Sequence, residues 1–391
     1  MTDCETPLAG LTVIEFTHMV MGPAVGAILA ELGARVIRVE PPGGDPTRRL
    51  GGSGAGYFSM YNRGKASIVV DLKQAAGITL AKRLVASADI LVENFRPGAM
   101  ERLGLGYMAL AEAHPRLIYC SQKGFLPGPY AHRTALDEVA QMMGGLAYMT
   151  GPPGRPLRAG ASVIDVTGGM FGVIAILAAV EQRHRTGRGQ QVDSALFETA
   201  VYLVGQHMAQ FAVTGTPAQP MPVRISAWAV YDIFDTVDDQ QLFVGVVSDA
   251  QWLRFCREFK FNAAPELATN ADRVAARATL LPLIRTLFGS MTQAELIARL
   301  ETTGLPFAPI IRPDELFDDL HLVASGGLAA VTLADGTVTE LPILPVTMAG
   351  KRTGRSFKLP AAGADTYTIL AELGLAADEI AALIAVGAVS D

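Results

Sequence analysis

Cysteine is scarce in this sequence of 391 residues, and the three present, Cys4, Cys120 and Cys256, are far apart. Their number is odd and their spacing matches no set of metal ligands, which argues against a disulfide framework and against a zinc site. We therefore expect reduced thiols, a cytoplasmic location and no bound metal.

No part of the chain concentrates charge of one sign. The 32 Lys and Arg residues and the 38 Asp and Glu residues give a formal net charge of −6, spread along the sequence. Without a basic block, neither a nucleic acid nor a membrane surface is an expected partner. The N-terminal stretch MTDCETPLAG carries two acids and no apolar segment, so we expect no signal peptide.

Long hydrophobic runs are also missing. The longest stretch free of charge, Val163–Val180 apart from Asp165, is interrupted by Thr167-Gly168-Gly169. A membrane span needs about 20 predominantly apolar residues, so this stretch is too short and too broken for one. We expect it to form a buried core helix instead.

Nucleotide-binding loops are incomplete or absent. The sequence contains no G-x-x-x-x-G-K-[ST] loop. Gly22, Gly26 and Glu40 match part of a dinucleotide-binding fingerprint, but Met21 or Pro23 stands where a glycine belongs. A strand, turn and helix that pack closely explain this pattern equally well, so a nicotinamide site is not favoured. We expect the glycine-rich stretch Gly51–Tyr57 to be a mobile loop.

What remains is the composition of a globular enzyme with a large core, with 50% hydrophobic residues, 18% charged residues, 40 Gly and 23 Pro. In the first part of the chain, short apolar runs alternate with helical patterns, which indicates parallel strands joined by crossover helices. The predicted fold class is α/β, with a doubly wound, Rossmann-like parallel sheet and a smaller α+β domain. The predicted strands are Leu11–Phe16, Arg35–Glu40, Ala66–Leu72, Asp89–Asn94 and Arg116–Ser121, and the predicted helices between them are Gly22–Ala34 and Gly77–Ser87.

The pattern changes after residue 137. Longer helices are predicted at Glu138–Met149, Met170–Arg185 and Leu196–Thr214, followed by a Pro-rich connection at Thr214–Val223. We expect a large domain at 1–200, a linker at 201–223, a small α+β domain at 224–319 and a second linker at 320–345. A C-terminal segment at 346–391, with helices at Asp365–Leu373 and Ala377–Ala385, is expected to return to the large domain.

Several basic residues are expected to follow strand ends, namely Arg63, Lys65, Lys73, Arg96 and Arg102. Ligands of open α/β sheets bind at the carboxyl ends of the strands, where such cations suit a phosphate group. A solvated helix rim explains the same spacing. His18 is the one histidine of six at a predicted strand-to-helix turn, where it could line a pocket.

Asp165 stands alone between Ile164 and Val166 at the start of the apolar run. An acid in such a setting finds a partner, shifts its pKa upward or takes part in chemistry. A structural role is equally open, because Asp165 precedes the predicted helix and could be its N-cap. The residue type alone does not decide between a cap and a catalyst.

Taken together, the runs GPAVGAILAELGARVIRVEPPGGDPTR, YNRGKASIVVDLK, ILVENFRPGAMERLGLGY, VAQMMGGLAYMTG and HRTGRGQQVDSALFE resemble the class III CoA-transferases. This family includes formyl-CoA transferase, carnitine CoA-transferase and the α-methylacyl-CoA racemases. The resemblance covers nearly the whole chain and implies a homodimer of two interlocked chains. It implies no tightly bound cofactor, with coenzyme A thioesters as substrates.

The resemblance places Asp165 at the family's nucleophilic aspartate. Its carboxylate would attack an acyl-CoA thioester, giving an aspartyl anhydride and then an aspartyl–CoA thioester that an acceptor acid opens. An apolar surrounding would protect the anhydride from water.

The same resemblance implies a set of CoA contacts along the chain. Lys73 and Arg102 are the expected phosphate partners. The full set consists of Val20, Met21, Val70, Asp71, Lys73, Asn94, Phe95, Arg96, Arg102, Thr134, Ala135, Leu136 and Asp137.

Three departures from the family pattern stand out. Position 41 is Pro where a cation is common, Ala227–Phe234 stands where formyl-CoA transferase has a glycine-rich loop, and Gly363–Tyr367 replaces the usual C-terminal turn. How the active site is shielded from water is therefore expected to differ.

The substrate is open at this point. Either Lys123 or His18 could bind a second carboxylate of the acceptor, which would make the acid a C4 or C5 dicarboxylate, or Lys123 could contact a CoA phosphate. The alternative enzyme class is an acyl-CoA 2-epimerase of the racemase type, which needs two proton-transfer groups. Leu136 stands where the racemases carry one of them, a histidine, so CoA transfer is favoured. A non-catalytic acyl-CoA-binding protein is disfavoured because Asp165 is present.

Overall fold

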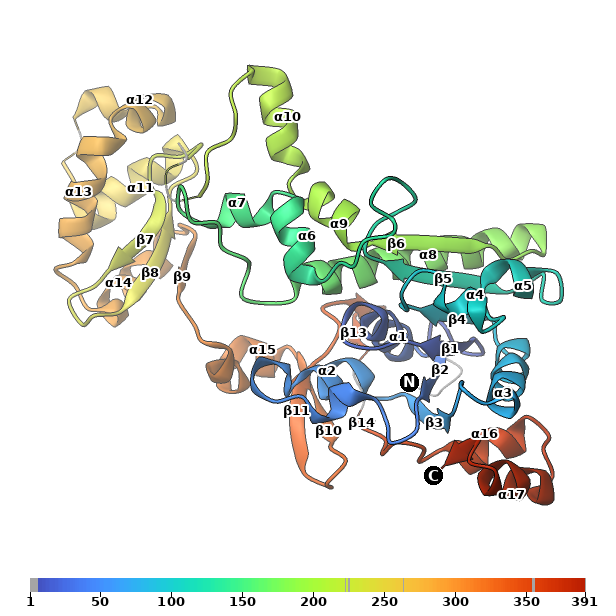
Figure 1. The fold of residues 1–391 in the computed structure, drawn as a ribbon. Coiled ribbons are helices and arrows are strands. Elements are labelled where there is room, and N and C mark those ends of the chain that lie inside the picture. Colours follow the sequence, from blue (N-terminus) through green and yellow to red (C-terminus); the bar gives the residue numbers. More distant parts are fainter. Residues whose placement is uncertain (1–5, 222, 224–225, 263, 354–355, 391) are drawn as a thin grey trace. The chain divides into compact units, whose positions relative to one another are not determined.

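The computed structural model describes residues 6–221, 223, 226–262, 264–353 and 356–390, so Cys4 lies outside the described residues. The chain divides into two units (Figure 1). The large unit consists of Met1–Pro222 and Leu320–Asp391, and the small unit consists of Val223–Asp319. The large unit is thus built from two separate stretches of sequence.

The core of the large unit is a sheet whose described strands have the order β15-β3-β2-β1-β4-β5-β6. All of its pairings are parallel except the one between β15 and β3. The predicted α/β class with a large parallel sheet is therefore confirmed. The strands are β1 (Thr12–Phe16), β2 (Arg35–Glu40), β3 (Ala66–Val70), β4 (Ile90–Glu93), β5 (Ile118–Lys123), β6 (Gln191–Ala195) and β15 (Val389–Ser390).

Helices cover both faces of this sheet, because successive strand residues point to opposite sides. On β1, Ile14 packs into a core cluster with α3 (Ala75–Ala86), α16 (Thr366–Glu372) and α17 (Ala377–Ala385). Val13 packs on the other face with α1 (Met21–Glu31) and α8 (Val163–Thr186). The strand order reverses between β1 and β4, and in open α/β sheets ligands bind at such a point.

The remaining elements of the large unit are short. The helices are η2 (Pro46–Arg49), η3 (Gly52–Gly54), α2 (Tyr57–Asn62), α4 (Ala99–Arg102), α5 (Tyr107–Ala111), α6 (Asp137–Met143), α7 (Leu146–Thr150), α9 (Leu196–Leu203), α10 (Gly205–Thr214) and α15 (Leu320–Ala324). The strands are β10 (Leu328–Thr332), β11 (Val338–Pro342), β12 (Thr347–Met348), β13 (Lys351–Arg352) and β14 (Phe357–Lys358).

The small unit has its own hydrophobic core beneath an antiparallel sheet of order β7-β8-β9. Trp252 and Phe255 stack in that core, and Phe288 packs edge-on against Phe255. The strands are β7 (Tyr231–Asp235), β8 (Gln241–Gly245) and β9 (Phe307–Pro309), and the helices are α11 (Asp249–Phe259), η4 (Pro265–Leu267), α12 (Asn270–Ala275), α13 (Arg277–Phe288), α14 (Gln293–Glu301) and η5 (Pro313–Asp318).

Helices α1 and α8 approach closely because three glycines of α8 face α1 and the sheet. A Cβ atom at Gly169 would lie 3.0 Å from the carbonyl oxygen of Met21 and 3.1 Å from the Ala24 side chain. At Gly172 it would lie 2.2 Å from the side-chain nitrogen of the buried Gln122. Gly168 meets the Met21 side chain in the same way. The helices therefore pack nearly backbone to backbone.

Long, apolar α8 is the one helix of the described residues that could cross a membrane by length and composition, a test that the core helix of a soluble protein also passes. Its buried residues include Val173 and Ile176, which belong to the core cluster shared with α1. Its placement agrees with the expected core helix.

Two of the cations expected beside a ligand are instead buried in ion pairs. Arg63 and Lys65 precede β3 rather than following it. The Arg63 guanidinium lies 2.6 Å from the carboxylate of Glu31, and the Lys65 ammonium lies 2.8 Å from that of Glu15. The interpretation of these two residues as cations that face a ligand is wrong, since each is paired with a buried acid.

The close contact of α1 and α8 leads to a stability prediction. We expect Gly169→Val to lower the free energy of unfolding by about 1–3 kcal/mol, because the branched side chain has no space against α1. Ala178→Val, at an exposed position of the same helix, is the control and should cost less than about 1 kcal/mol. Urea unfolding of both variants measures the difference, and equal losses would show that the contact tolerates side chains.

Candidate active site

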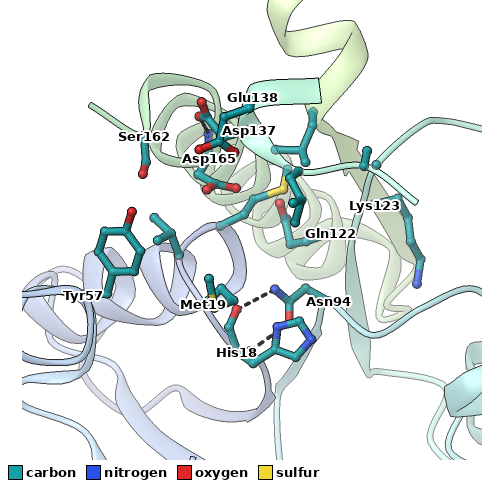
Figure 2. A pocket seen from close by; sticks show the side chains of 16 residues that line it. His18, Met19, Tyr57, Asn94, Gln122, Lys123, Asp137, Glu138, Ser162 and Asp165 are labelled. Atoms are coloured by element: carbon teal, nitrogen blue, oxygen red, sulfur yellow. Dashed lines mark hydrogen bonds between the residues drawn. The ribbon is translucent and has the colours of Figure 1, made fainter. Parts of the chain in front are cut away.

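A cavity of about 280 Å³ opens at the carboxyl ends of β1, β4 and β5, next to the reversal of strand order. Figure 2 shows Asp165, Ser162 and Tyr57 on one side of it, with His18 and Asn94 on the other. Its lining consists of His18, Met19, Val20, Met21, Tyr57, Asn94, Gln122, Lys123, Gly124, Ala135, Leu136, Asp137, Glu138, Ser162, Asp165 and Leu196.

The turn between β1 and α1 is fixed by Asn94, which follows β4. The Asn94 amide nitrogen donates to the carbonyl oxygen of His18 at 2.8 Å, and its oxygen accepts from the backbone N–H of His18 at 2.9 Å. The next residue, Met19, has a φ of 61°, a left-handed conformation that is costly for a residue with a side chain. Strain of this kind gathers at functional sites, and here it directs the chain into the cavity.

The His18 ring lies against Phe95, with ring centroids 6.0 Å apart. Phe95 is thereby placed beside the cavity without lining it, and His18 reaches the lining from the turn.

Asp165 lies in the first turn of α8, which begins earlier than the sequence indicates. The helix starts at Val163 and Ser162 occupies the N-cap position, so the hypothesis that Asp165 is the N-cap is wrong. The cap comes from another element, because the Asp137 carboxylate accepts from the backbone N–H groups of Ile164 at 2.7 Å and Asp165 at 3.0 Å.

Asp137 is itself held in place by Gln141, one turn further along α6. The Gln141 amide nitrogen donates to the other oxygen of Asp137, and its oxygen accepts from the backbone N–H of Ala159 at 2.8 Å. Asp137 is almost fully buried and carries the second negative charge of the site. The network therefore ties α6, α8 and the loop before α8 together around Asp165.

The Asp165 carboxylate faces the cavity, and no described residue forms a stabilising contact with it. Burial, and then the negative charges of Asp137 and Glu138, raise its pKa from 3.8 to about 7. Across the described residues, no hydrogen bond to its side-chain oxygens offsets these effects. A weakly solvated carboxylate with a raised pKa is a good nucleophile once it is ionised.

Lys123 ends β5 and is directed away from Asp165 (Figure 2). Its ammonium lies 2.6 Å from the carboxylate of Glu93, which is 1% exposed and also accepts from the Ser121 hydroxyl. A second, longer hydrogen bond runs to the carbonyl oxygen of Phe95 at 3.4 Å.

Of the residues expected at the site, the structure brings nine together around the cavity. They are His18, Val20, Met21, Asn94, Lys123, Ala135, Leu136, Asp137 and Asp165. The others lie outside its lining, most of them in the segments after β3 and β4, and are Val70, Asp71, Lys73, Phe95, Arg96, Arg102 and Thr134.

Lys73, Arg96 and Arg102 are exposed, and within the described ranges none of them forms a salt bridge. Asp71 accepts hydrogen bonds from the backbone N–H of Lys73 and the side chain of Gln74, so it shapes the turn that presents Lys73. Three exposed cations in the segments that follow β3 and β4 suit the phosphates of a nucleotide.

Six lining side chains were not expected from the sequence, namely Met19, Tyr57, Gln122, Glu138, Ser162 and Leu196. Tyr57 closes the glycine-rich stretch predicted to be a mobile loop, whereas the structure has the short helices η3 and α2 there. Glu138 could have been found from its position beside Asp137.

The sequence and the fold are both similar to those of known proteins. The family model described as CoA-transferase family III matches residues 8–366. A protein of Agrobacterium fabrum named succinate–glutarate CoA-transferase is 34% identical, covering 95% of this chain and 97% of its own. A protein of Acetobacter aceti named acetyl-CoA:oxalate CoA-transferase is 37% identical, covering 78% and 81%. The crystal structure of a CaiB/BaiF family protein from Brucella suis superposes with a TM-score of 0.82 at 34% identity, covering 94% and 99%.

The raised pKa of Asp165 predicts that this residue destabilises the fold at neutral pH. Because the folded chain binds the proton more tightly than the unfolded chain, stability falls as pH rises from about 4 to about 7. We expect Asp165→Asn to raise the free energy of unfolding by about 1–3 kcal/mol at pH 8 and to give no gain near pH 4. Urea unfolding at fixed protein concentration measures this difference.

Asp335→Asn is the control, because hydrogen bonds from Thr337 lower the pKa of this exposed acid. It should show no gain in stability at pH 8. A gain for Asp165→Asn that is the same at both pH values would contradict the electrostatic origin.

Proposed function

The chain belongs to CoA-transferase family III, and from this premise we propose that it moves CoA from an acyl-CoA donor to a dicarboxylic acid through Asp165. The observation that carries the proposal is a partly buried carboxylate without a stabilising partner, at the cavity where the strand order reverses. The names of the relatives, which include succinate, glutarate and oxalate, support a dicarboxylic acceptor.

The first half of the reaction loads CoA onto the protein. An Asp165 oxygen attacks the thioester carbonyl carbon, the C–S bond breaks, and CoA leaves as a thiolate while an acyl-aspartyl anhydride remains. The thiolate then attacks the aspartyl carbonyl carbon, which releases the donor's acid as a carboxylate and leaves an aspartyl–CoA thioester.

The second half repeats these steps in reverse order. A carboxylate oxygen of the acceptor attacks the aspartyl carbonyl carbon and expels the CoA thiolate, forming a new anhydride. The thiolate attacks the acceptor's acyl carbon, so the new acyl-CoA leaves and the Asp165 carboxylate returns. The complete reaction needs no redox partner and no net transfer of a proton.

The surroundings of Asp165 suit these steps. Partial burial removes water that would hydrolyse the anhydride, and the left-handed turn held by Asn94 places Val20 and Met21 beside the carboxylate. The exposed Lys73, Arg96 and Arg102 would bind the CoA phosphates. Coenzyme A is here a substrate and not a resident cofactor.

The racemase alternative lacks support at the position where that chemistry needs a base. Leu136 occupies the place of the racemase histidine and lines the cavity with a side chain that transfers no proton.

We expect Asp165→Ala to reduce CoA transfer at least about a thousandfold while the chain stays folded, because the covalent route disappears. Incubating the wild type with succinyl-CoA should add the mass of CoA at Asp165, detected by intact-protein mass spectrometry and peptide mapping. Below pH 7 the rate of loading should fall as Asp165 becomes protonated. Transfer by Asp165→Ala at a near wild-type rate would refute the covalent mechanism.

The chain is also proposed to form an interlocked homodimer in the cytoplasm. Helix α10 buries none of its residues, and Met208, Phe211 and Val213 on it are exposed. An apolar groove of about 410 Å³ also lies between α1, α8 and the segment 342–346. Large exposed apolar patches are rare on monomeric proteins. We expect a second copy of the chain to cover these surfaces.

Light scattering on a gel-filtration column tests the dimer. The wild type should have twice the chain mass of 41.3 kDa, and the double change Met208→Asp with Phe211→Asp should shift it toward one chain mass. A wild-type mass equal to one chain would refute the dimer.

A further inference from the structure

The cavity around Asp165 is rich in negative charge, which a carboxylic acceptor must overcome. Asp165, Asp137 and Glu138 all line it, while the acceptor of the proposed reaction brings one carboxylate to Asp165 and a second elsewhere. A second carboxylate placed among acids needs a cation as its partner. The cation best able to bind it is the one whose existing ion pair costs least free energy to break. The need for this cation rests on the proposed function.

Lys123 is a poor candidate for this role. Its partner Glu93 is buried, and Lys123 supplies the positive charge beside it. Moving the ammonium to a substrate would leave the buried Glu93 carboxylate without its cation, which is strongly unfavourable. His18 is positively charged only when protonated, and its ring is stacked on Phe95.

Arg158 is bound in a very different way. Its guanidinium lies 2.9 Å from the carboxylate of Glu138, and both side chains are nearly half exposed, at 46% and 47%. An ion pair this exposed contributes little to stability, so an incoming carboxylate can take the place of Glu138 at little cost. The neighbouring backbone is fixed, because the N–H of Ala159 donates to Gln141.

The position of the pair connects it to the reaction. Glu138 lines the cavity and follows Asp137, which caps the turn carrying Asp165. Its negative charge repels that of Asp165 and contributes to the raised pKa of Asp165. Arg158 therefore lies one side chain away from the cavity lining, and its planar guanidinium can hold a carboxylate with two parallel hydrogen bonds.

We propose that Arg158 binds the distal carboxylate of the acceptor acid by exchanging Glu138 for it, and so selects dicarboxylic over monocarboxylic acids. Glu138 holds the guanidinium at the cavity while no acceptor is bound. Without Arg158, the charge of Glu138 is unscreened and repels the same substrate. The two partners of one salt bridge therefore have opposite effects on the acceptor.

The test uses the full-length protein with saturating succinyl-CoA as donor at pH 8, where Asp165 is ionised. The acceptors are glutarate and pentanoate, which have the same chain length and differ by one carboxylate. Arg158→Gln should raise the KM for glutarate about tenfold or more, and lower the preference for glutarate over pentanoate by the same factor. Glu138→Gln should lower the KM for glutarate, because Arg158 then has no competing partner.

Arg155→Gln is the matched control, since Arg155 is an exposed cation of the same loop and does not line the cavity. It should leave both KM values unchanged. A purely structural salt bridge would give a different result. Arg158→Gln and Glu138→Gln would then change the KM for glutarate and the KM for pentanoate in the same direction.

Loading of CoA onto Asp165 separates this inference from the function on which it rests. If the Arg158→Gln variant still loads CoA and keeps the wild-type preference for glutarate, the proposed role of Arg158 is wrong. The transferase proposal is unaffected by that result. A wild type that loads no CoA from any donor in a panel of acyl-CoA thioesters overturns both.

Discussion

The site depends on the contact between α1 and α8, which glycine makes possible. With Gly169 and Gly172 at the crossing, the two helices approach until only backbone and small side chains separate them. The first turn of α8 therefore lies beside the first turn of α1, and Asp165 shares one cavity with Val20 and Met21. Larger residues at the crossing would move the carboxylate away from the turn that faces it.

The acids around this contact fall into two groups, those paired with a cation and one that is not. Glu15, Glu31 and Glu93 are buried and each has a cation within hydrogen-bonding distance. Among the described residues, no cation lies within hydrogen-bonding distance of Asp165, and its neighbours Asp137 and Glu138 add charge of the same sign. The proposed nucleophile thus differs from the other buried acids in having no compensating charge, and its raised pKa is expected to lower the stability of the fold at neutral pH.

The sequence predicted the first five strands because they are short runs of Val, Ile and Leu that are buried on both sides. It did not predict β6, since QVDSA is an edge strand with polar residues and lacks that pattern. The helix expected at Glu138–Met149 is broken at Gly144, whose Cβ would lie 2.4 Å from Ala200. Local propensity carries no information on such tertiary contacts.

The same limit applies to the site. Asp165 could be singled out because an acid in an apolar run is unusual, and the resemblance to a family assigned it a role. The partners of the cations could not be deduced, since pairing Arg63 with Glu31 or Arg158 with Glu138 requires segments far apart in sequence to meet. Their burial decides which cations are available, and burial is a property of the assembled fold.

The large unit is interrupted in sequence by the small one, and this sets the order in which the chain can fold as it is synthesised. Residues 223–319 contain a complete core of their own and can fold before the C-terminal stretch has left the ribosome. The sheet must wait for β15 to cover the edge of β3, and for α16 and α17 to cover one face. At about 5–20 residues per second, synthesis from the end of β6 to β15 takes about 10 to 40 seconds, during which the apolar surface of the unfinished sheet is exposed to chaperones.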